Sequence, residues 1–265
     1  MTQLKSYDFV LDRYVRSIEW LREEFSGMDD LADVVMGIRD WDDAVCVEFG
    51  GKSLLVSVDG PYKKRLVMKS ALIHASTDVV VKGGKPLFAL DTLIGGKDDV
   101  KEMALSLKNQ ALAMEIPLLG GNTMFEDDAA PRANITVVGG LVTDEPIRDS
   151  GAREGDFLVV VGEPIWGSQR QRIDKAINLF ETWSDILHSL KVNAAKDVTK
   201  GGLAATIYEI SAKSEVEFKL EEEIGLPMTR NLDNFLISIS PLDYRKVGRI
   251  CKKRGCWMAK IGEVF

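Results

Sequence analysis

Strand-like and helix-like segments alternate along the chain, and the alternation restarts after a polar, glycine-bearing turn at Gly151–Asp156. Short apolar runs rich in β-branched residues indicate strands, and longer runs with apolar residues three or four apart indicate helices. Before the turn, the strand-like runs are 44–49, 53–58, 86–93 and 133–142, and the helix-like runs are 66–81 and 97–114. After it, the strand-like runs are 157–161, 235–239 and 257–261, and the helix-like runs are 171–190, a stretch from 201, and 242–253. This order predicts an α/β protein of two domains, residues 1–150 and 151–265.

Two local patterns refine this outline. Apolar residues recur at helical spacing from Tyr7 to Phe25, which predicts a leading helix that ends at Gly27 and belongs to the first domain. The pair Gly50-Gly51 between two strand-like runs predicts a hairpin turn.

Charge and cysteine content exclude several classes of protein. The formal net charge is −7 and no basic run is present, which argues against nucleic-acid binding through phosphate contacts. No segment approaches the roughly 20 apolar residues of a membrane span, and the charged first residues are unlike a signal peptide. The scattered Cys46, Cys251 and Cys256 suit neither a disulfide framework nor a zinc site, so a cytoplasmic location is expected.

The residues that indicate chemistry are aspartates at strand ends, beside glycines or inside apolar runs. They are Asp42, Asp43, Asp59, Asp78, Asp91 and Asp197. Several buried carboxylates in one place would repel each other, and a bound Mg²⁺ ion, which prefers carboxylate and phosphate oxygens, would remove that repulsion. Because ATP supplies phosphates, the pattern predicts ATP- and Mg²⁺-dependent phosphoryl transfer. For the pair 42–43 a solvated helix cap is an equal alternative, and for Asp78 and Asp91 an exposed polar face remains open.

Two glycine pairs are candidate anion-binding turns. Gly120-Gly121-Asn122-Thr123 follows a strand-like run, and Gly201-Gly202 opens a helix whose free N–H groups can face an anion. Taken alone, each pair also fits an ordinary turn.

Other catalytic arrangements are less well supported. His74 and His188 lie in helical stretches without a nucleophile elbow nearby, which favours packed or surface histidines. No G-x-x-x-x-G-K-(S/T) segment is present, which argues against a P-loop.

From about residue 40 onward, these segments resemble the aminoimidazole-ribonucleotide (AIR) synthetase, or PurM-like, superfamily. Its members include AIR synthetase, thiamine-monophosphate kinase, selenophosphate synthetase and a hydrogenase-maturation protein. The matching segments are 42–44 against G-D-D-A, 59–64 against D-G-V-G-T-K, 77–91 against N-D-(apolar)₃-x-G-A-x-P-L-F-F-L-D, 120–123 against G-G-(D/E)-T, and 197–203 against D-V-(S/T)-x-G-G-L.

The resemblance implies a two-domain PurM-like fold, with an N-terminal mixed sheet that pairs in a homodimer and a C-terminal α/β domain. ATP with Mg²⁺ would lie between the domains, partly across the dimer, and would activate an oxygen of a small-molecule substrate. The implied metal ligands are Asp43, Asp59, Asp78 and Asp197, and the implied catalytic residues are Asp59, Lys64 and Asp78. The implied nucleotide-binding residues are Asp42, Asp91, Gly120, Gly121, Asn122, Thr123, Asp197, Gly201 and Gly202.

Departures from the family pattern keep other functions open. Asn122 replaces an acidic residue, Lys200 stands where the thiamine-phosphate kinases have an acid, and Tyr62-Lys63 replace Gly-Thr. The second domain is also short for the family. A non-catalytic nucleotide-binding sensor or scaffold is therefore the alternative, and a plain interaction protein is a more distant one.

Overall fold

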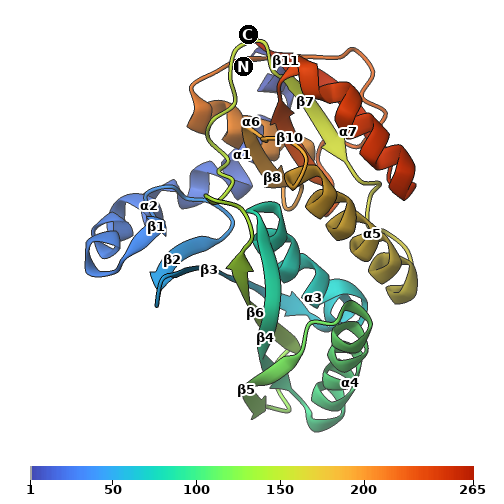
Figure 1. The fold of residues 1–265 in the computed structure, drawn as a ribbon. Coiled ribbons are helices and arrows are strands. Elements are labelled where there is room, and N and C mark those ends of the chain that lie inside the picture. The colour runs from blue at the N-terminus through green and yellow to red at the C-terminus, as the bar shows by residue number, and fades with distance from the viewer. Residues whose placement is uncertain (1) are drawn as a thin grey trace.

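The computed structural model describes residues 2–265, with side chains from residue 4. The chain forms two β-sheets, one of six strands and one of five (Figure 1). The first sheet has the strand order β1-β2-β3-β6-β4-β5, in which only the β4–β5 pair is parallel. Its strands are β1 Val34–Met36, β2 Val45–Phe49, β3 Lys52–Lys63, β4 Gly84–Gly95, β5 Leu118–Phe125 and β6 Arg132–Leu141. The predicted hairpin at Gly50-Gly51 is confirmed, and both glycines have positive φ angles.

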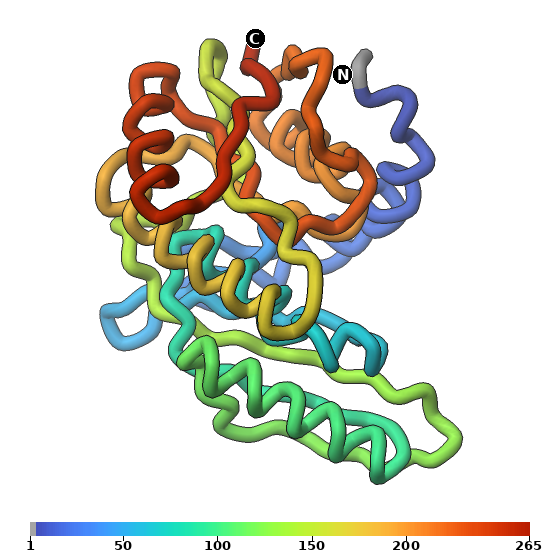
Figure 2. Tube along the Cα trace, turned by 90° about the vertical axis from the view of Figure 1, so that its right-hand side faces the viewer, coloured from blue at the N-terminus to red at the C-terminus, as the bar shows by residue number. Residues whose placement is uncertain are grey.

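Two helices, α3 (Lys64–Val81) and α4 (Lys97–Met114), cover one face of this sheet. The opposite face carries no helix in Figure 1. The end of the first sheet that carries α4 and β5 extends away from the second sheet (Figure 2).

The second sheet has the order β8-β10-β7-β11-β9, and all its pairs are antiparallel. Its strands are β7 Phe157–Val161, β8 Ala194–Asp197, β9 Phe218–Leu220, β10 Phe235–Ile239 and β11 Met258–Val264. Its helices are α5 Gln169–Leu187, α6 Gly202–Ser214 and α7 Pro241–Arg254. Ser168 caps α5 through a capping box with Gln171, which fixes where this helix begins.

Helix α3 joins the two halves. Leu72 and Val79 pack in the core of the first sheet, whereas Ile73 and Val80 pack in the core that β7, β10 and α5 form. Trp183 of α5 donates its indole N–H to the carbonyl of Val80 at 2.8 Å. A helix that is apolar on all sides is a buried helix, and α3 is therefore held between the domains.

The leading segment differs from the prediction. Instead of one helix it forms η1 (Thr2–Tyr7), α1 (Asp8–Tyr14), η2 (Arg16–Ile18), α2 (Glu19–Phe25) and η3 (Ser26–Leu31). It also packs on the C-terminal half, because Leu4 joins the core that lines α6 and Leu11 contacts Ala205. The segment, which was assigned to the first domain, thus contacts the C-terminal half. Among the helices of residues 2–265, none has the length and apolar character of a membrane-spanning segment.

Candidate functional site

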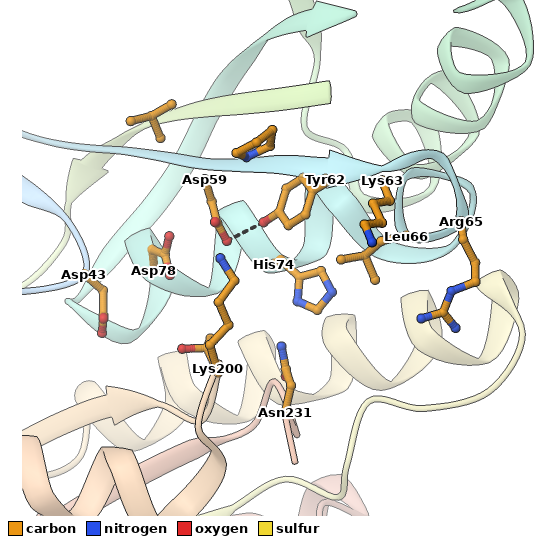
Figure 3. A pocket seen from close by; sticks show the side chains of 13 residues that line it. Asp43, Asp59, Tyr62, Lys63, Arg65, Leu66, His74, Asp78, Lys200 and Asn231 are labelled. Atoms are coloured by element: carbon orange, nitrogen blue, oxygen red, sulfur yellow. Dashed lines mark hydrogen bonds between the residues drawn. The ribbon is translucent and has the colours of Figure 1, made fainter. Parts of the chain in front are cut away.

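A cavity of about 390 Å³ lies where α3 faces the turn after β8 (Figure 3). Strand β3, helix α3 and loops of the C-terminal half all contribute to its wall. The lining residues are Asp43, Val58, Asp59, Pro61, Tyr62, Lys63, Arg65, Leu66, His74, Asp78, Thr199, Lys200 and Asn231.

Three aspartates from distant parts of the sequence meet at one end of this cavity, where Asp43 and Asp78 line the wall and Asp197 is buried beside them. Asp43 precedes β2, Asp78 lies on α3, and Asp197 ends β8. One carboxylate oxygen of each lies within 4.8 Å of the other two. The alternative of an exposed polar face does not hold for Asp78, because Asp78 is buried.

Hydrogen bonds orient these carboxylates but leave two oxygens without partners. Ser57 donates to Asp78 Oδ2 at 2.6 Å, and Thr77 donates to Asp197 Oδ2 at 2.9 Å. Lys196 forms an ion pair with Asp43 Oδ1. Asp43 Oδ2 and Asp197 Oδ1 are buried and accept no hydrogen bond from the residues that the structure describes, although Lys82 Nζ lies 3.6 Å from Asp43 Oδ2. Buried carboxylate oxygens without a hydrogen bond are costly, and a hard divalent cation is a ligand that would satisfy them.

The electrostatics agree with this interpretation. Burial, followed by the neighbouring charge of Asp197, raises the pKa of Asp78 well above its usual value. Burial and the charge of Asp43 likewise raise the pKa of Asp197. Like charges held together out of water are a feature of functional sites, although structural ion-pair networks show it too.

Asp59 lines the same cavity but stands beside the three-carboxylate cluster. A bulge in β3 places Asp59 opposite Ile135 of β6 and Tyr62 opposite Ala133. The side chains of Asp59 and Tyr62 therefore point to the same side of the sheet. The Tyr62 hydroxyl donates a short hydrogen bond to Asp59 Oδ2. Figure 3 shows the Lys200 side chain reaching toward Asp59 from the other side of the cavity.

His74 is a site residue that the sequence did not reveal as one. Its Nδ1 lies 2.5 Å from Asp233 Oδ1, and its Nε2 lies 3.1 Å from Ser70 Oγ. Burial lowers the pKa of His74, but the charge of Asp233 and the hydrogen bond to it raise the pKa overall. The partner is 159 positions away, and no motif connects the two residues. The expectation of a packed histidine holds, yet its ring also forms part of the cavity wall.

Asp42 does not line the cavity. It lies in a buried ion cluster in which Lys82 and Lys213 contact both Asp42 and Asp149. Burial, followed by the charge of Asp149, raises the pKa of Asp42. These contacts join the first domain, the linker and α6, which gives Asp42 a structural position instead of the predicted nucleotide contact.

Lys64 also lies outside the cavity. Helix α3 begins at Lys64, and the side chain turns toward α4, where its Nζ is 2.6 Å from both Asp99 Oδ1 and Glu102 Oε2. The adjacent Lys63 and Arg65 line the cavity instead. Lys64, which was expected to contact phosphate, therefore does not join the aspartates in this cavity.

The predicted nucleotide residues at 120–123 lie on β5, at the edge of the sheet farthest from β1. They belong to a strand, not to the turn that was expected to follow one. A Cβ at Gly121 would collide with Asp91, which requires glycine there. Asp91 lines a second cavity of about 600 Å³ against α4, so within one chain this group is separate from the aspartate cluster.

Gly201 and Gly202 have φ angles of +90° and +64°, which explains why both are glycines. Gly202 N–H donates to Thr199 O, and Ala204 N–H donates to Met228 O. Two N–H groups at the start of α6 are therefore occupied, and Thr199 and Lys200, just before this turn, line the cavity.

The fold and this cavity define a two-domain α/β protein whose carboxylates meet across the domain boundary. The model of the AIR synthase related protein N-terminal domain matches residues 41–141, and that of the C-terminal domain matches residues 172–265. The chain belongs to the AIR synthase related protein family, and the predicted PurM-like fold is confirmed.

Known proteins resemble the chain over most of its length. The uncharacterized protein MJ0799 of Methanocaldococcus jannaschii is 32% identical over 99% of this chain and 90% of its own. A selenide, water dikinase of Carboxydothermus hydrogenoformans is 27% identical over 73% of this chain and 60% of its own.

Solved structures share the fold at lower identity. Thermotoga maritima PurL complexed with ATP has a TM-score of 0.70 at 17% identity, covering 88% of this chain and 42% of the PurL chain. The HypE–HypF complex has a TM-score of 0.65 at 20% identity, covering 86% of this chain and 88% of the solved one. The chain thus spans less than half the length of PurL.

Proposed function

We propose that the chain binds ATP with Mg²⁺ in the cavity and transfers the terminal phosphoryl group to an oxygen of a small molecule. The observation that carries the proposal is the convergence of Asp43, Asp78 and Asp197 from both domains, with two buried carboxylate oxygens that accept no hydrogen bond from the residues that the structure describes. The selenide, water dikinase and the ATP-bound PurL support an ATP-dependent reaction within this family.

The residues present suit a bound divalent ion and its chemistry. Ser57 and Thr77 orient Asp78 and Asp197, and Lys196 pairs with Asp43, while one carboxylate oxygen of each aspartate lies within 4.8 Å of the other two. A bound Mg²⁺ ion would neutralise the charge that develops on the phosphoryl oxygens. Phosphoryl transfer requires positioning and charge neutralisation more than a protein nucleophile, and no serine or cysteine is among the described residues that line the cavity.

We also propose that the protein acts as a homodimer through the outer face of the first sheet. Val58, Thr136 and Leu90 form one row across β3, β6 and β4 on the face away from α3 and α4. Val58 is 70% exposed and Leu90 37%. An uncovered apolar sheet face is typical of an interface, and β5 with residues 120–123 borders this face.

Nucleotide binding tests the proposal directly. Calorimetric titration of the parent with Mg²⁺ and a non-hydrolysable ATP analogue should give a saturable isotherm, and the Asp78→Asn variant should lose it. Asp99→Asn is the matched control, because Asp99 is an acid that pairs with Lys64 outside the cavity. If Asp78→Asn binds as tightly as the parent, the assignment of the site is wrong.

Catalysis requires a separate measurement. Tyr62 holds Asp59, and Asn122 replaces an acidic residue of the family pattern, which favours the sensor or scaffold alternative. Phosphate release from ATP in the presence of candidate acceptors distinguishes the two. Nucleotide binding without any turnover would identify a sensor.

A further inference from the structure

We propose that Cys251 and Cys256 form a thiol–disulfide exchange site, at which a low-molecular-weight disulfide converts two free thiols into a reversible intramolecular disulfide. The two residues lie at the end of α7, and both are free thiols in this structure. Neither of them lines the aspartate cavity, so this inference does not depend on the proposed function.

The first argument is the hydrogen bonding at the end of α7, which brings the two cysteines together. Cys256 N–H donates to the carbonyl of Cys251 at 2.9 Å, and Gly255 N–H donates to the carbonyl of Lys252 at 3.3 Å. Gly255 has a left-handed backbone, with a φ of +65°. These features define a Schellman motif, in which the side chains of the first and sixth residues commonly touch. In this chain both of those residues are cysteines.

The chain that follows holds Cys256 in this position. The carbonyl of Trp257 accepts a hydrogen bond from Gly162 N–H at 2.7 Å. Met258 then begins β11 and pairs with Val161 of β7. A disulfide forms without strain only where the backbone already places both cysteines close together. The helix end on one side and the sheet on the other provide that placement.

The two thiols differ in exposure and acidity. Both side chains belong to the core that β7, β10 and α5 form, but Cys251 is only 1% exposed, whereas Cys256 is partly exposed. A hydrogen bond between the two thiols lowers the pKa of Cys256 and raises the pKa of Cys251. A partly exposed thiol of lowered pKa beside a second, buried thiol is the arrangement of an attacking cysteine and its resolving partner.

This asymmetry assigns the order of the two exchange steps. The Cys256 thiolate attacks one sulfur of the small disulfide, which breaks the S–S bond and releases one small thiol. The Cys251 sulfur then attacks the Cys256 sulfur of the mixed disulfide and releases the second small thiol, which takes up the Cys251 proton. The two protein thiols are oxidised to one disulfide, and the small disulfide is reduced to two thiols.

The test equilibrates the full chain in mixtures of reduced and oxidised glutathione, followed by rapid alkylation of free thiols and peptide mass spectrometry. We expect a product that has lost two hydrogen atoms and in which Cys251 is linked to Cys256. Cys46 is the internal control, since it is buried in the core of the first sheet and should remain reduced.

Two variants separate the steps. Cys251→Ala should stop at the mixed disulfide, with one glutathione attached to Cys256, because the resolving thiol is missing. Cys256→Ala should leave Cys251 unmodified, because its thiol is buried. A thermal melt of each variant checks that it is folded.

A comparison of the folded and unfolded parent needs no variant. At a fixed ratio of reduced to oxidised glutathione, the ratio of disulfide to dithiol should be about tenfold higher in the native protein than in urea. The reason is that the native fold already holds the two thiols together, whereas the unfolded segment must find this arrangement by chance.

Three results would overturn the inference. A parent that accumulates glutathione on Cys256 without an intramolecular disulfide would show that the two sulfurs cannot meet. An equal ratio of disulfide to dithiol in urea would show that the fold does not build the site. A native protein whose two thiols both stay reduced would show that they supply only the apolar contact that commonly closes this motif.

Discussion

Asp78 and Asp197 lie in different domains, yet a carboxylate oxygen of one is within 4.8 Å of a carboxylate oxygen of the other. Both residues are buried. Burial and the charges of neighbouring aspartates make ionisation of each carboxyl group less favourable and so raise both pKa values. This arrangement destabilises the metal-free protein and is relieved by a cation, so it links metal binding to the junction of the domains.

Replacing one member of this pair should therefore raise the stability of the metal-free protein and lower its affinity for Mg²⁺. Asp197→Asn keeps an acceptor for the Thr77 hydroxyl but removes one buried charge. In the presence of EDTA, we expect the variant to be more stable than the parent by about 1 kcal/mol, because repulsion is removed. We also expect its Mg²⁺ affinity to fall about tenfold or more. Urea unfolding and metal titration measure the two effects, and a destabilised variant with unchanged Mg²⁺ affinity would contradict the assignment.

Metal affinity should depend on pH in a defined direction. The pKa values of Asp78 and Asp197 are raised, so the cluster retains protons at a pH where ordinary carboxyl groups have lost them. Mg²⁺ must displace those protons, and its affinity should rise as the pH rises from about 5 to 8. Calorimetry in two buffers of different ionisation enthalpy should reveal protons released on binding. The Asp99→Asn control should release as many protons as the parent, within experimental error. The Asp197→Asn variant should release fewer.

The same raised pKa values predict the pH dependence of the metal-free protein. Between the ordinary carboxyl pKa of about 4 and the raised values, the native state binds more protons than the unfolded state. Stability should therefore fall as the pH rises through this window. Asp149 has the opposite effect on the pH dependence of stability. Burial alone would raise its pKa, but the positive charges of Lys196, Lys213 and Lys82 lower the pKa overall. The relevant measurement is the difference between the parent and Asp197→Asn across this range, which should grow with pH.

His74 and Asp233 form a buried pair between the domains, and breaking it should be costly. We expect His74→Ala to destabilise the protein by about 3 kcal/mol, since Asp233 would remain buried without its partner. Because the folded-state pKa of His74 is raised, its contribution is complete below the unfolded value of about 6.5 and is lost as the pH rises through the folded value. Melting curves from pH 5 to 9 should show a loss of stability in the parent that the variant lacks. Identical pH profiles would show that His74 does not titrate in this way.

If the protein dimerises through this sheet face, a charged residue placed on the face should give a monomer. Leu90→Asp puts a carboxylate in the exposed row on β4, away from the nucleotide cavity, and sedimentation should then give a mass of one chain. Leu242→Asp is the control, because Leu242 is 91% exposed on α7. A parent that is already monomeric at micromolar concentration would contradict the dimer.

The sequence predicted the two-domain fold and the aspartates of the site because both depend on local signals. Apolar periodicity identifies most strands and helices of the two sheets, and aspartates in apolar runs stand out without knowledge of the fold. Asp43, Asp78 and Asp197 do meet as the pattern predicted.

The errors arose where the answer depends on side-chain direction or distant contacts. Which of Lys63, Lys64 and Arg65 faces the cavity depends on where α3 begins, and helix boundaries are poorly determined by sequence. His74 acquires its place from Asp233, which is remote in sequence. The short leading helices pack on α6 because tertiary burial of Leu4 and Leu11 decides their position, and no local pattern specifies it.

The most direct test of the central claim is the position of a divalent ion in crystals grown with Mn²⁺ and a non-hydrolysable ATP analogue. Anomalous scattering locates Mn²⁺ without ambiguity. We predict a peak about 2 Å from carboxylate oxygens of Asp43, Asp78 and Asp197, with the nucleotide's phosphates on its open side. Mn²⁺ bound elsewhere, with these three carboxylates contacting neither metal nor phosphate, would contradict the account.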